Sequence, residues 1–330
     1  MPELPEVETI CRQLAPSLEG RWIETIEVAD PRWCDPAPPE AVEDAMRGRR
    51  IERVWRRGKY LVVSLEDDVH LAMHLRMTGN LLLVGGEDDE PGHVRVRVGL
   101  DDGRWLLFSD VRRFGTGDVL LGSGAVAEYF ASRLGVEPLS RDFTADALRA
   151  LARGRRQPVK AFLLNQERIA GVGNIYADEA LFRARLHPLR PVGSLRRPQI
   201  ELLREAVIES LEQGIDAKGA SIDDYRHVDG ARGSFQDRFL VHLREGEPCP
   251  RCGTSIQKMR AAGRGTYLCP RCQRRPRFTR PAGSEASRPG RPPAARESRR
   301  PPDRPPRSAG TSSARSGRPD RSGPRGPSPG

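Results

Sequence analysis

The chain begins with a proline and a glutamate that could act together on a sugar. Pro2 follows Met1, and an initiating methionine is normally removed before so small a residue. An exposed α-amino group has a pKa near ~8, so a useful fraction of the Pro2 amine would be neutral and nucleophilic at pH 7. Attack of this amine on an anomeric carbon would give an iminium ion, with Glu3 as a general acid. An N-terminal Pro-Glu pair alone is weak evidence, since most such termini have no chemical role.

Four cysteines near the C-terminus have the spacing of a metal site. Cys249 and Cys252 form one C-x-x-C pair, Cys269 and Cys272 form a second, and 16 residues separate the pairs. This spacing predicts one structural Zn²⁺ held by four sulfurs, with no ligand position left open for water. Two disulfides are the alternative, but the acidic start MPELPEVE is unlike a secretory signal and argues against an oxidising compartment.

Cations and glycines elsewhere have patterns that suit phosphate. The turn at residues 171–174 (GVGN) opens onto an expected helix, whose free amides would face an anion. Arg260 and Arg264 lie between the cysteine pairs on an expected hairpin, well placed for backbone phosphates. Lys59 follows Gly58 at the start of an expected strand. A solvated basic surface is the alternative interpretation for the hairpin, as an ordinary exposed lysine is for Lys59.

The order of several short strings is more specific than any one of them. The chain opens with MPELPEVETI and continues with GKYL at 58–61, HLRMTG at 74–79, DVRRFG at 110–115, LGVEPL at 134–139, Lys160, GVGNIYADE at 171–179 and the four cysteines. In this order they closely resemble the formamidopyrimidine-DNA glycosylase family, bacterial enzymes that excise oxidised purines such as 8-oxoguanine. The resemblance covers about residues 1–277.

The resemblance implies a multi-domain α+β fold and a bifunctional DNA repair enzyme, a DNA N-glycosylase with AP lyase activity. The fold would be a β-sandwich with an N-terminal helix, a helix–two-turn–helix domain and a zinc-finger hairpin. Pro2 would be the Schiff-base nucleophile and Glu3 the proton donor. Lys59 would assist β-elimination and Arg264 δ-elimination, with Glu6 supporting the site.

The resemblance also implies which residues contact damaged double-stranded DNA. Met77, Arg112 and Phe114 match the residues that fill the hole left by the extruded base, and such wedges are known from other DNA-bending proteins. Arg112 would offer donors to the orphaned cytosine. The alternative places Met77 and Phe114 in the sandwich core, which alternation in 108–114 does not decide. Further cations and polar groups would grip phosphates: His93, Arg156, Lys160 and Asn174.

One string departs from the family pattern, and two other functions compete. The loop that covers the lesion commonly has Gly-Gly before Thr or Ser, whereas residues 218–221 here are KGAS. The preferred damaged base is therefore left open.

The related endonuclease VIII type, which prefers oxidised pyrimidines, usually starts Pro-Glu-Gly-Pro-Glu, so Leu4 and the string at 112–114 favour the purine enzyme. A non-catalytic reader of DNA or RNA would need no free N-terminus.

The elements that must position these residues fall into segments. Residues 1–140 begin with a helix, in which Val7, Ile10 and Leu14 recur at helical spacing and Gly20 is the stop, and continue as strands. Residues 141–246 are helical: Thr144 would cap a helix to about 152, Asn174 one to about 185, and a third would end at Gly214. Residues 247–280 form the zinc module.

Charge is distributed unevenly along the chain. The 330 residues contain 55 Lys+Arg against 45 Asp+Glu, a formal net charge of +10. Residues 281–330 contain no large apolar residue, and their 11 arginines and four acidic residues give +7, which leaves +3 for residues 1–280. We expect this tail to be disordered. No apolar run approaches the ~18 residues of a membrane span. We expect no membrane partner, a monomer, and a cytoplasmic, nucleoid-associated bacterial protein.

Overall fold

The first helix begins where the sequence predicts. Helix α1 spans Leu4–Leu18 in the computed structural model, which describes residues 2–86, 91–222, 228 and 230–275. Pro5 lies in its first turn, where a missing N–H costs no helical hydrogen bond. Glu3 is the N-cap residue, and its backbone N–H donates to the Glu6 carboxylate at 2.8 Å. The N-terminus is thereby held as part of a capped helix.

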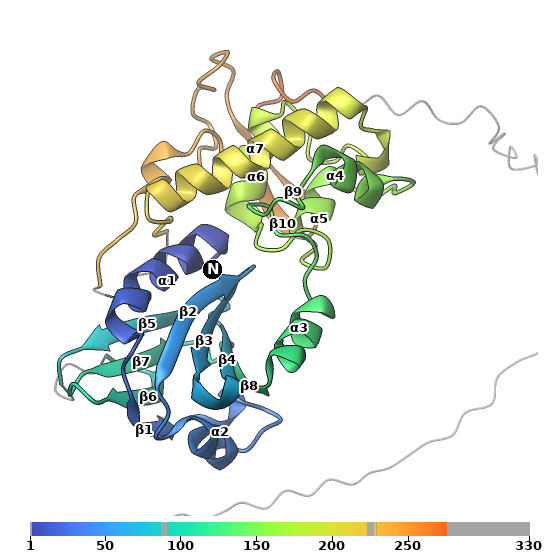
Figure 1. The fold of residues 1–330 in the computed structure, drawn as a ribbon. Coiled ribbons are helices and arrows are strands. Elements are labelled where there is room, and N and C mark those ends of the chain that lie inside the picture. The colour runs from blue at the N-terminus through green and yellow to red at the C-terminus, as the bar shows by residue number, and fades with distance from the viewer. Residues whose placement is uncertain (1, 87–90, 223–227, 229, 276–330) are drawn as a thin grey trace, which may run out of the picture. The chain divides into compact units, whose positions relative to one another are not determined.

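Two antiparallel four-stranded sheets form the predicted β-sandwich (Figure 1). In one sheet the order is β1 (Ile23–Val28), β6 (Val94–Leu100), β7 (Trp105–Asp110), β5 (Gly79–Val84). In the other it is β2 (Ile51–Arg57), β3 (Tyr60–Leu65), β4 (Val69–His74), β8 (Thr116–Leu121). Val94, Val96 and Val98 are buried, as the alternation predicts. Apolar residues of both sheets share a core with α1.

Residues 1–140 also contain two further helices, which the strand-rich pattern did not predict. These are α2 (Pro39–Met46) and α3 (Ser123–Ala131). In α2 only Val42 and Met46 are buried, too few positions for a helical period to be recognised. Single 3₁₀ turns occur at Pro31–Trp33 and Glu66–Asp68.

The second half is helical, with boundaries that differ slightly from the expected ones. It contains α4 (Ala145–Ala152), α5 (Val159–Leu164), α6 (Asn174–Arg183) and α7 (Arg197–Asp216), with 3₁₀ turns at Val192–Ser194 and Phe235–Arg238. Thr144 caps α4 by accepting from the Ala147 N–H at 3.1 Å. Asn174 is not a cap: Gly173 has that position. Helix α7 continues past Gly214, whose missing side chain lets the Tyr176 ring pack against the helix.

The cysteine module is a hairpin packed on the helical region. Strands β9 (Gln257–Ala261) and β10 (Arg264–Leu268) pair antiparallel, and β10 contacts α6 (Figure 1). Phe182 of α6 shares a small core with Val241, Tyr267 and the cysteines. The hairpin is therefore anchored on the helix that follows the glycine turn.

The described residues include no helix long and apolar enough to span a membrane. The tail at 281–330 lies outside them, as do residues 276–280 of the zinc module and residues 223–225 of the loop after α7. The domain boundaries at 140, 246 and 280 stay predictions.

Candidate active site and nucleic-acid interface

The N-terminus lies where two hydrophobic cores meet. Leu4 packs in the helical core, whereas Val7 and the later apolar residues of α1 pack in the sandwich core. The Leu4 N–H donates to the Gly171 carbonyl at 3.1 Å, so the chain start is bonded to the glycine turn. Pro2 and Glu3 are buried at this junction. A proline amine at this position would be held in place rather than free to move.

The glycine turn receives the Glu3 carboxylate. Glu3 Oε1 accepts from the Ile175 N–H at 3.0 Å, in the first turn of α6. A side chain at Gly173 would overlap the carboxylate, so only glycine admits Glu3 here. Glu3 Oε2 is buried and has no hydrogen-bond partner among the described residues. One carboxylate oxygen is thus fixed by a helix N-terminus, and the other is available for proton transfer.

Glu6 connects the N-terminus to two distant segments. Its Oε1 accepts from the Tyr176 hydroxyl at 2.7 Å and from the Ala220 N–H at 2.8 Å. Its Oε2 accepts from the Glu3 N–H. Burial raises the pKa of Glu6, and the charge of Glu3 raises it further. Ala220 is the residue that departs from the family pattern, so Glu6 holds the start of that loop directly.

Lys59 lies in the tight turn between β2 and β3 and is almost completely buried, with 5% of its surface exposed. Burial lowers the pKa of its ammonium group; the charge of Glu3 opposes this shift, and that of Arg264 adds to it. The charges of Glu3 and Arg264 therefore both act on Lys59. A lysine with a lowered pKa is more often neutral near pH 7 and can accept a proton.

The turn that carries Lys59 is held by Glu137, to which the sequence assigned no role. Glu137 Oε2 accepts from the Gly58 N–H at 3.0 Å, and the carboxylate forms ion pairs with Arg56 and Arg57. Arg56 also pairs with Glu8 of α1 at 2.9 Å. Glu137 lies in the LGVEPL string, which was identified in the sequence. The partners of Glu137 lie about 80 residues away in the sequence, so the string did not indicate them.

Arg264 is exposed at the start of β10, and the hairpin behind it is anchored by two predicted site residues. The Gly265 carbonyl accepts from Asn174 Nδ2 at 3.1 Å and from Lys160 Nζ at 3.3 Å. Arg264 thus projects from a backbone fixed to α5 and α6.

The burial of Lys160 corrects the expectation of a phosphate contact. Its side chain is fully buried, and its ammonium bonds Asp178 and the Thr266 hydroxyl, each at 2.7 Å. Burial lowers the pKa of Lys160, and the charge of Asp178 opposes that shift. A phosphate would have to displace these partners. We therefore interpret Lys160 as a buried anchor of the hairpin rather than a surface cation.

Met77, Arg112 and Phe114 are exposed on two adjacent loops of the sandwich. Met77 has 42% of its surface exposed and Phe114 52%, so the alternative that places them in the core is wrong. The Arg112 guanidinium carbon lies 4.9 Å from the centre of the Phe114 ring. An aromatic ring under a cation presents one compact wedge of mixed apolar and donor character.

The remaining predicted phosphate contacts are exposed. His93 precedes β6, and its carbonyl accepts from the Asp110 N–H at 3.0 Å, which places it at the base of the Arg112 loop. Arg156 lies between α4 and α5. Both side chains are accessible to a polyanion.

The four cysteines fit a tetrahedral metal site. Their sulfur atoms all lie within 4.8 Å of one another, with separations of 3.9 Å (Cys249–Cys272), 3.5 Å (Cys252–Cys269) and 3.6 Å (Cys252–Cys272). Zn–S bonds of about 2.3 Å in a tetrahedron require S···S separations of about 3.8 Å. Disulfides would need about 2.05 Å. The Arg251 N–H donates to the Cys249 sulfur at 3.4 Å, as a thiolate ligand favours.

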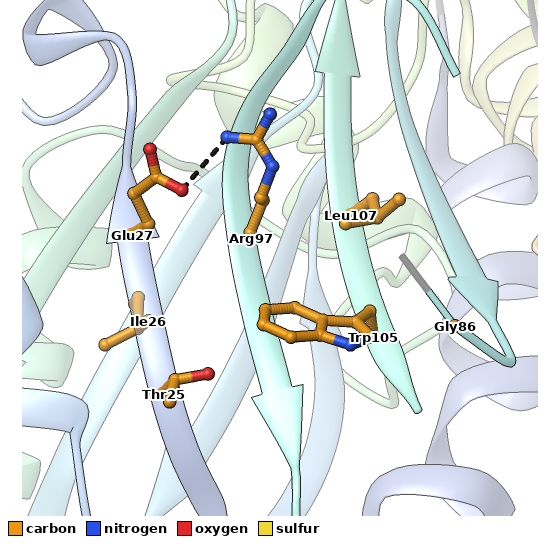
Figure 2. A pocket seen from close by; sticks show the side chains of 7 residues that line it. All are labelled: Thr25, Ile26, Glu27, Gly86, Arg97, Trp105 and Leu107. Carbon is orange, nitrogen blue, oxygen red and sulfur yellow. Dashed lines mark hydrogen bonds and ion pairs between the residues drawn. The ribbon is translucent and has the colours of Figure 1, made fainter. Parts of the chain in front are cut away.

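A cavity of the sandwich lies apart from these residues. It is a hollow of about 400 Å³ on the β1–β6–β7 sheet, lined by Thr25, Ile26, Glu27, Gly86, Arg97, Trp105 and Leu107 (Figure 2). Glu27 and Arg97 form an ion pair at 3.1 Å across its edge. None of the predicted site residues lines it.

Three protein-family models and many known proteins match the chain. Residues 1–117 match the formamidopyrimidine-DNA glycosylase N-terminal domain, residues 134–226 its H2TH domain, and residues 246–275 the zinc finger found in FPG and IleRS. A formamidopyrimidine-DNA glycosylase of Chloroflexus aurantiacus is 46% identical over 274 residues, which are 83% of this chain and 98% of the relative.

Solved structures of the same kind contain damaged DNA. A mutant Lactococcus lactis FPG with Fapy-dG-containing DNA has a TM-score of 0.79 and 37% identity. MutM in complex with carbocyclic 8-oxo-G-containing DNA has a TM-score of 0.77 and 37% identity. Each alignment covers 83% of this chain and all of the other.

The sandwich, the helical domain and the zinc finger define a DNA repair enzyme, a DNA N-glycosylase with AP lyase activity. The chain belongs to the formamidopyrimidine-DNA glycosylase family. The zinc-finger match and the sulfur geometry together identify a zinc-binding module.

Proposed function

We propose that the chain excises oxidised purines, 8-oxoguanine and formamidopyrimidines, from duplex DNA and then nicks the abasic site by β,δ-elimination. The observation that supports this most directly is the burial of Pro2 and Glu3 at the junction of the two cores, where Glu3 bonds the Ile175 N–H of α6. The neighbouring Asn174 bonds the Gly265 carbonyl, next to Arg264. An amine, a carboxylate, a buried lysine and an arginine are the groups that this chemistry requires.

In the proposed mechanism the neutral Pro2 nitrogen attacks C1′ of the damaged nucleoside. The glycosidic bond breaks, and the base leaves with the bonding electrons and takes up the proton that the Pro2 nitrogen loses. Glu3 protonates the ring oxygen as the sugar opens, which leaves an iminium ion at C1′. Loss of a C2′ proton, assisted by Lys59, expels the 3′ phosphate. Arg264 assists the second elimination, which expels the 5′ phosphate.

The exposed residues account for binding in this proposal. Met77, Arg112 and Phe114 enter the space vacated by the extruded base, which offsets part of the few kcal/mol that extrusion costs. His93, Arg156 and Asn174 contact the phosphate backbone, and affinity therefore falls steeply with salt.

Borohydride trapping tests the nucleophile. Reduction of the iminium ion should join the protein covalently to a duplex with 8-oxoguanine opposite cytosine. A Pro2→Leu variant should not be trapped, because it has no proline amine and its large second residue retains Met1, which displaces the terminal amine by one residue. Glu3→Gln should bind the duplex and excise the base about 10²–10⁴-fold more slowly. No adduct with the wild type, or an intact adduct with Pro2→Leu, would contradict the mechanism.

Two further measurements separate the competing functions. Excision of 8-oxoguanine should exceed excision of thymine glycol; the reverse order would indicate the pyrimidine-specific type. Mass spectrometry should find Pro2 as a free N-terminus. Retained Met1 or acetylated Pro2 would favour a non-catalytic DNA or RNA reader.

We further propose one Zn²⁺ per chain, a monomer, and a cytoplasmic, nucleoid-associated location. Metal analysis should give one zinc per chain, light scattering should give the mass of one chain, and a fluorescent fusion should colocalise with DNA.

A further inference from the structure

The three exposed wedge residues lie on two different loops, and one buried carboxylate joins them. Met77 lies in the loop between β4 and β5, whereas Arg112 and Phe114 lie between β7 and β8. Asp110, the last residue of β7, is 1% exposed. None of the ion pairs formed by the described residues includes it. The Arg95 guanidinium bonds its backbone carbonyl at 3.0 Å, whereas its carboxylate accepts from backbone N–H groups and a hydroxyl.

Asp110 accepts hydrogen bonds from both loops. Its Oδ2 accepts from the Phe114 N–H at 2.9 Å and from the Gly115 N–H at 2.7 Å. Its Oδ1 accepts from the Arg112 N–H at 3.2 Å and from the Thr78 hydroxyl. The Arg112 N–H is also within 3.2 Å of Thr78 Oγ1. Thr78 directly follows Met77, so a single carboxylate bonds the residue next to one wedge and the backbone of the other two.

This arrangement is specific to a carboxylate. A buried charge without a cation is costly unless several donors surround it, and backbone N–H groups are such donors. Asparagine has the same shape, but its amide would present two hydrogens to these donors. The number and direction of the donors therefore determine the residue type at 110.

Glycines at the ends of both loops pack against one aromatic ring, that of Phe108. A side chain at Gly79 would lie 2.6 Å from the Leu75 carbonyl and 2.9 Å from the Phe108 ring. A side chain at Gly115 would overlap Phe108 and lie 3.1 Å from Asp110 Oδ2. Phe108 is 2% exposed, so it forms a rigid floor under the two loops.

We propose that Asp110 and Thr78 are positioning residues that couple the two loops, so that Met77, Arg112 and Phe114 enter the duplex as one preorganised unit. This inference rests on the proposed function of those three side chains. Its consequence concerns the specificity for the base opposite the lesion. The Arg112 guanidinium is directed toward that base, and we expect this direction to depend on the Asp110–Arg112 and Asp110–Thr78 bonds.

The test measures a ratio, the rate of 8-oxoguanine excision opposite cytosine divided by the rate opposite adenine. A variant that only folds less well loses both rates equally, and the ratio stays constant. Asp110→Asn should lower the ratio about tenfold, in the range that one specific base contact contributes. Thr78→Val, which replaces the hydroxyl with a methyl group, should lower the ratio less, and Thr78→Ser, which keeps the hydroxyl, should leave the ratio at the wild-type value. A 2-aminopurine opposite the lesion should report weaker insertion in the first two variants.

Asp118→Asn is the matched control, because Asp118 accepts from the Tyr129 hydroxyl at 2.7 Å in the same sandwich and touches neither loop. Its ratio should equal that of the wild type. If Asp110→Asn does not fold, the ratio measured for Thr78→Val tests the coupling instead. An unchanged ratio in folded Thr78→Val would overturn the coupling. A wild type that is trapped but shows no preference for cytosine would overturn the sensing role of Arg112 and this inference together. A wild type that is never trapped would instead contradict the proposed function.

Discussion

At the scale of single residues, Lys59 shows how burial changes chemistry. The pKa of Lys59 is lower in the folded chain than in the unfolded chain, where it is about 10.4. At pH values between these two pKa values, the unfolded chain therefore binds more protons than the folded chain. Stability therefore rises with pH across this window. We predict that wild type gains stability relative to Lys59→Met as the pH rises from neutral toward 10, measured as the free energy of unfolding in denaturant. A pH-independent difference between the two proteins would contradict the shift.

Gly173 shows how one missing side chain admits Glu3, the proposed proton donor. We predict that Gly173→Ala displaces Glu3 and slows base excision about 10²-fold, because a displacement near 1 Å is enough for such a loss. Single-turnover excision measures this effect. Gly124→Ala is a suitable control, since a side chain there would meet nothing within 4 Å. Excision by Gly173→Ala at the wild-type rate would mean that Glu3 is not confined by this turn.

At the scale of elements, we predict that the cysteine hairpin depends on a bound zinc ion. Structural zinc contributes about 10–16 kcal/mol to folding of isolated finger peptides. The core around Phe182 and Tyr267 is small and includes the cysteines themselves. We predict that Cys269→Ser loses its zinc, that β9 and β10 no longer hold Arg264, and that DNA affinity falls at least tenfold. Metal analysis and a mobility-shift titration measure these effects.

The control for the hairpin is Cys34→Ser. Cys34 is buried outside the cluster, and its thiol donates to the Ala37 carbonyl at 3.3 Å, a bond that a serine hydroxyl can replace. This variant should keep its zinc and its affinity. Full DNA affinity in zinc-free Cys269→Ser would show that the hairpin is dispensable for binding.

At the scale of the whole molecule, the tail carries most of the net charge. Residues 281–330 contribute +7 of the total of +10. We predict that deleting them reduces the dependence of log affinity on log salt, by up to about six if every net charge meets a phosphate. Excision at saturating DNA should not change, because the site lies within residues 2–275. An unchanged salt slope would exclude the tail from DNA binding.

Much of this protein could be predicted from the sequence because the signals are local. Spacing alone identified the four cysteines, since a C-x-x-C pair brings two sulfurs to one metal in almost any backbone. The periodic apolar residues of α1 and the alternation in β6 predicted those elements. Helices α2 and α3 were missed because each buries only two residues.

Only the tertiary structure decided which side chains of the candidate site are buried and which are exposed. For charged side chains this depends on partners that are distant in the sequence. Lys160 was expected at the surface, yet Thr266, 106 positions away, and Asp178 enclose its ammonium group. The strings around Met77 and Phe114 are equally compatible with core and surface until the two sheets pack. A strand or helix pattern states which faces are apolar, but not which distant residue neutralises a charge. Such a charge can be buried only where the fold supplies its partners.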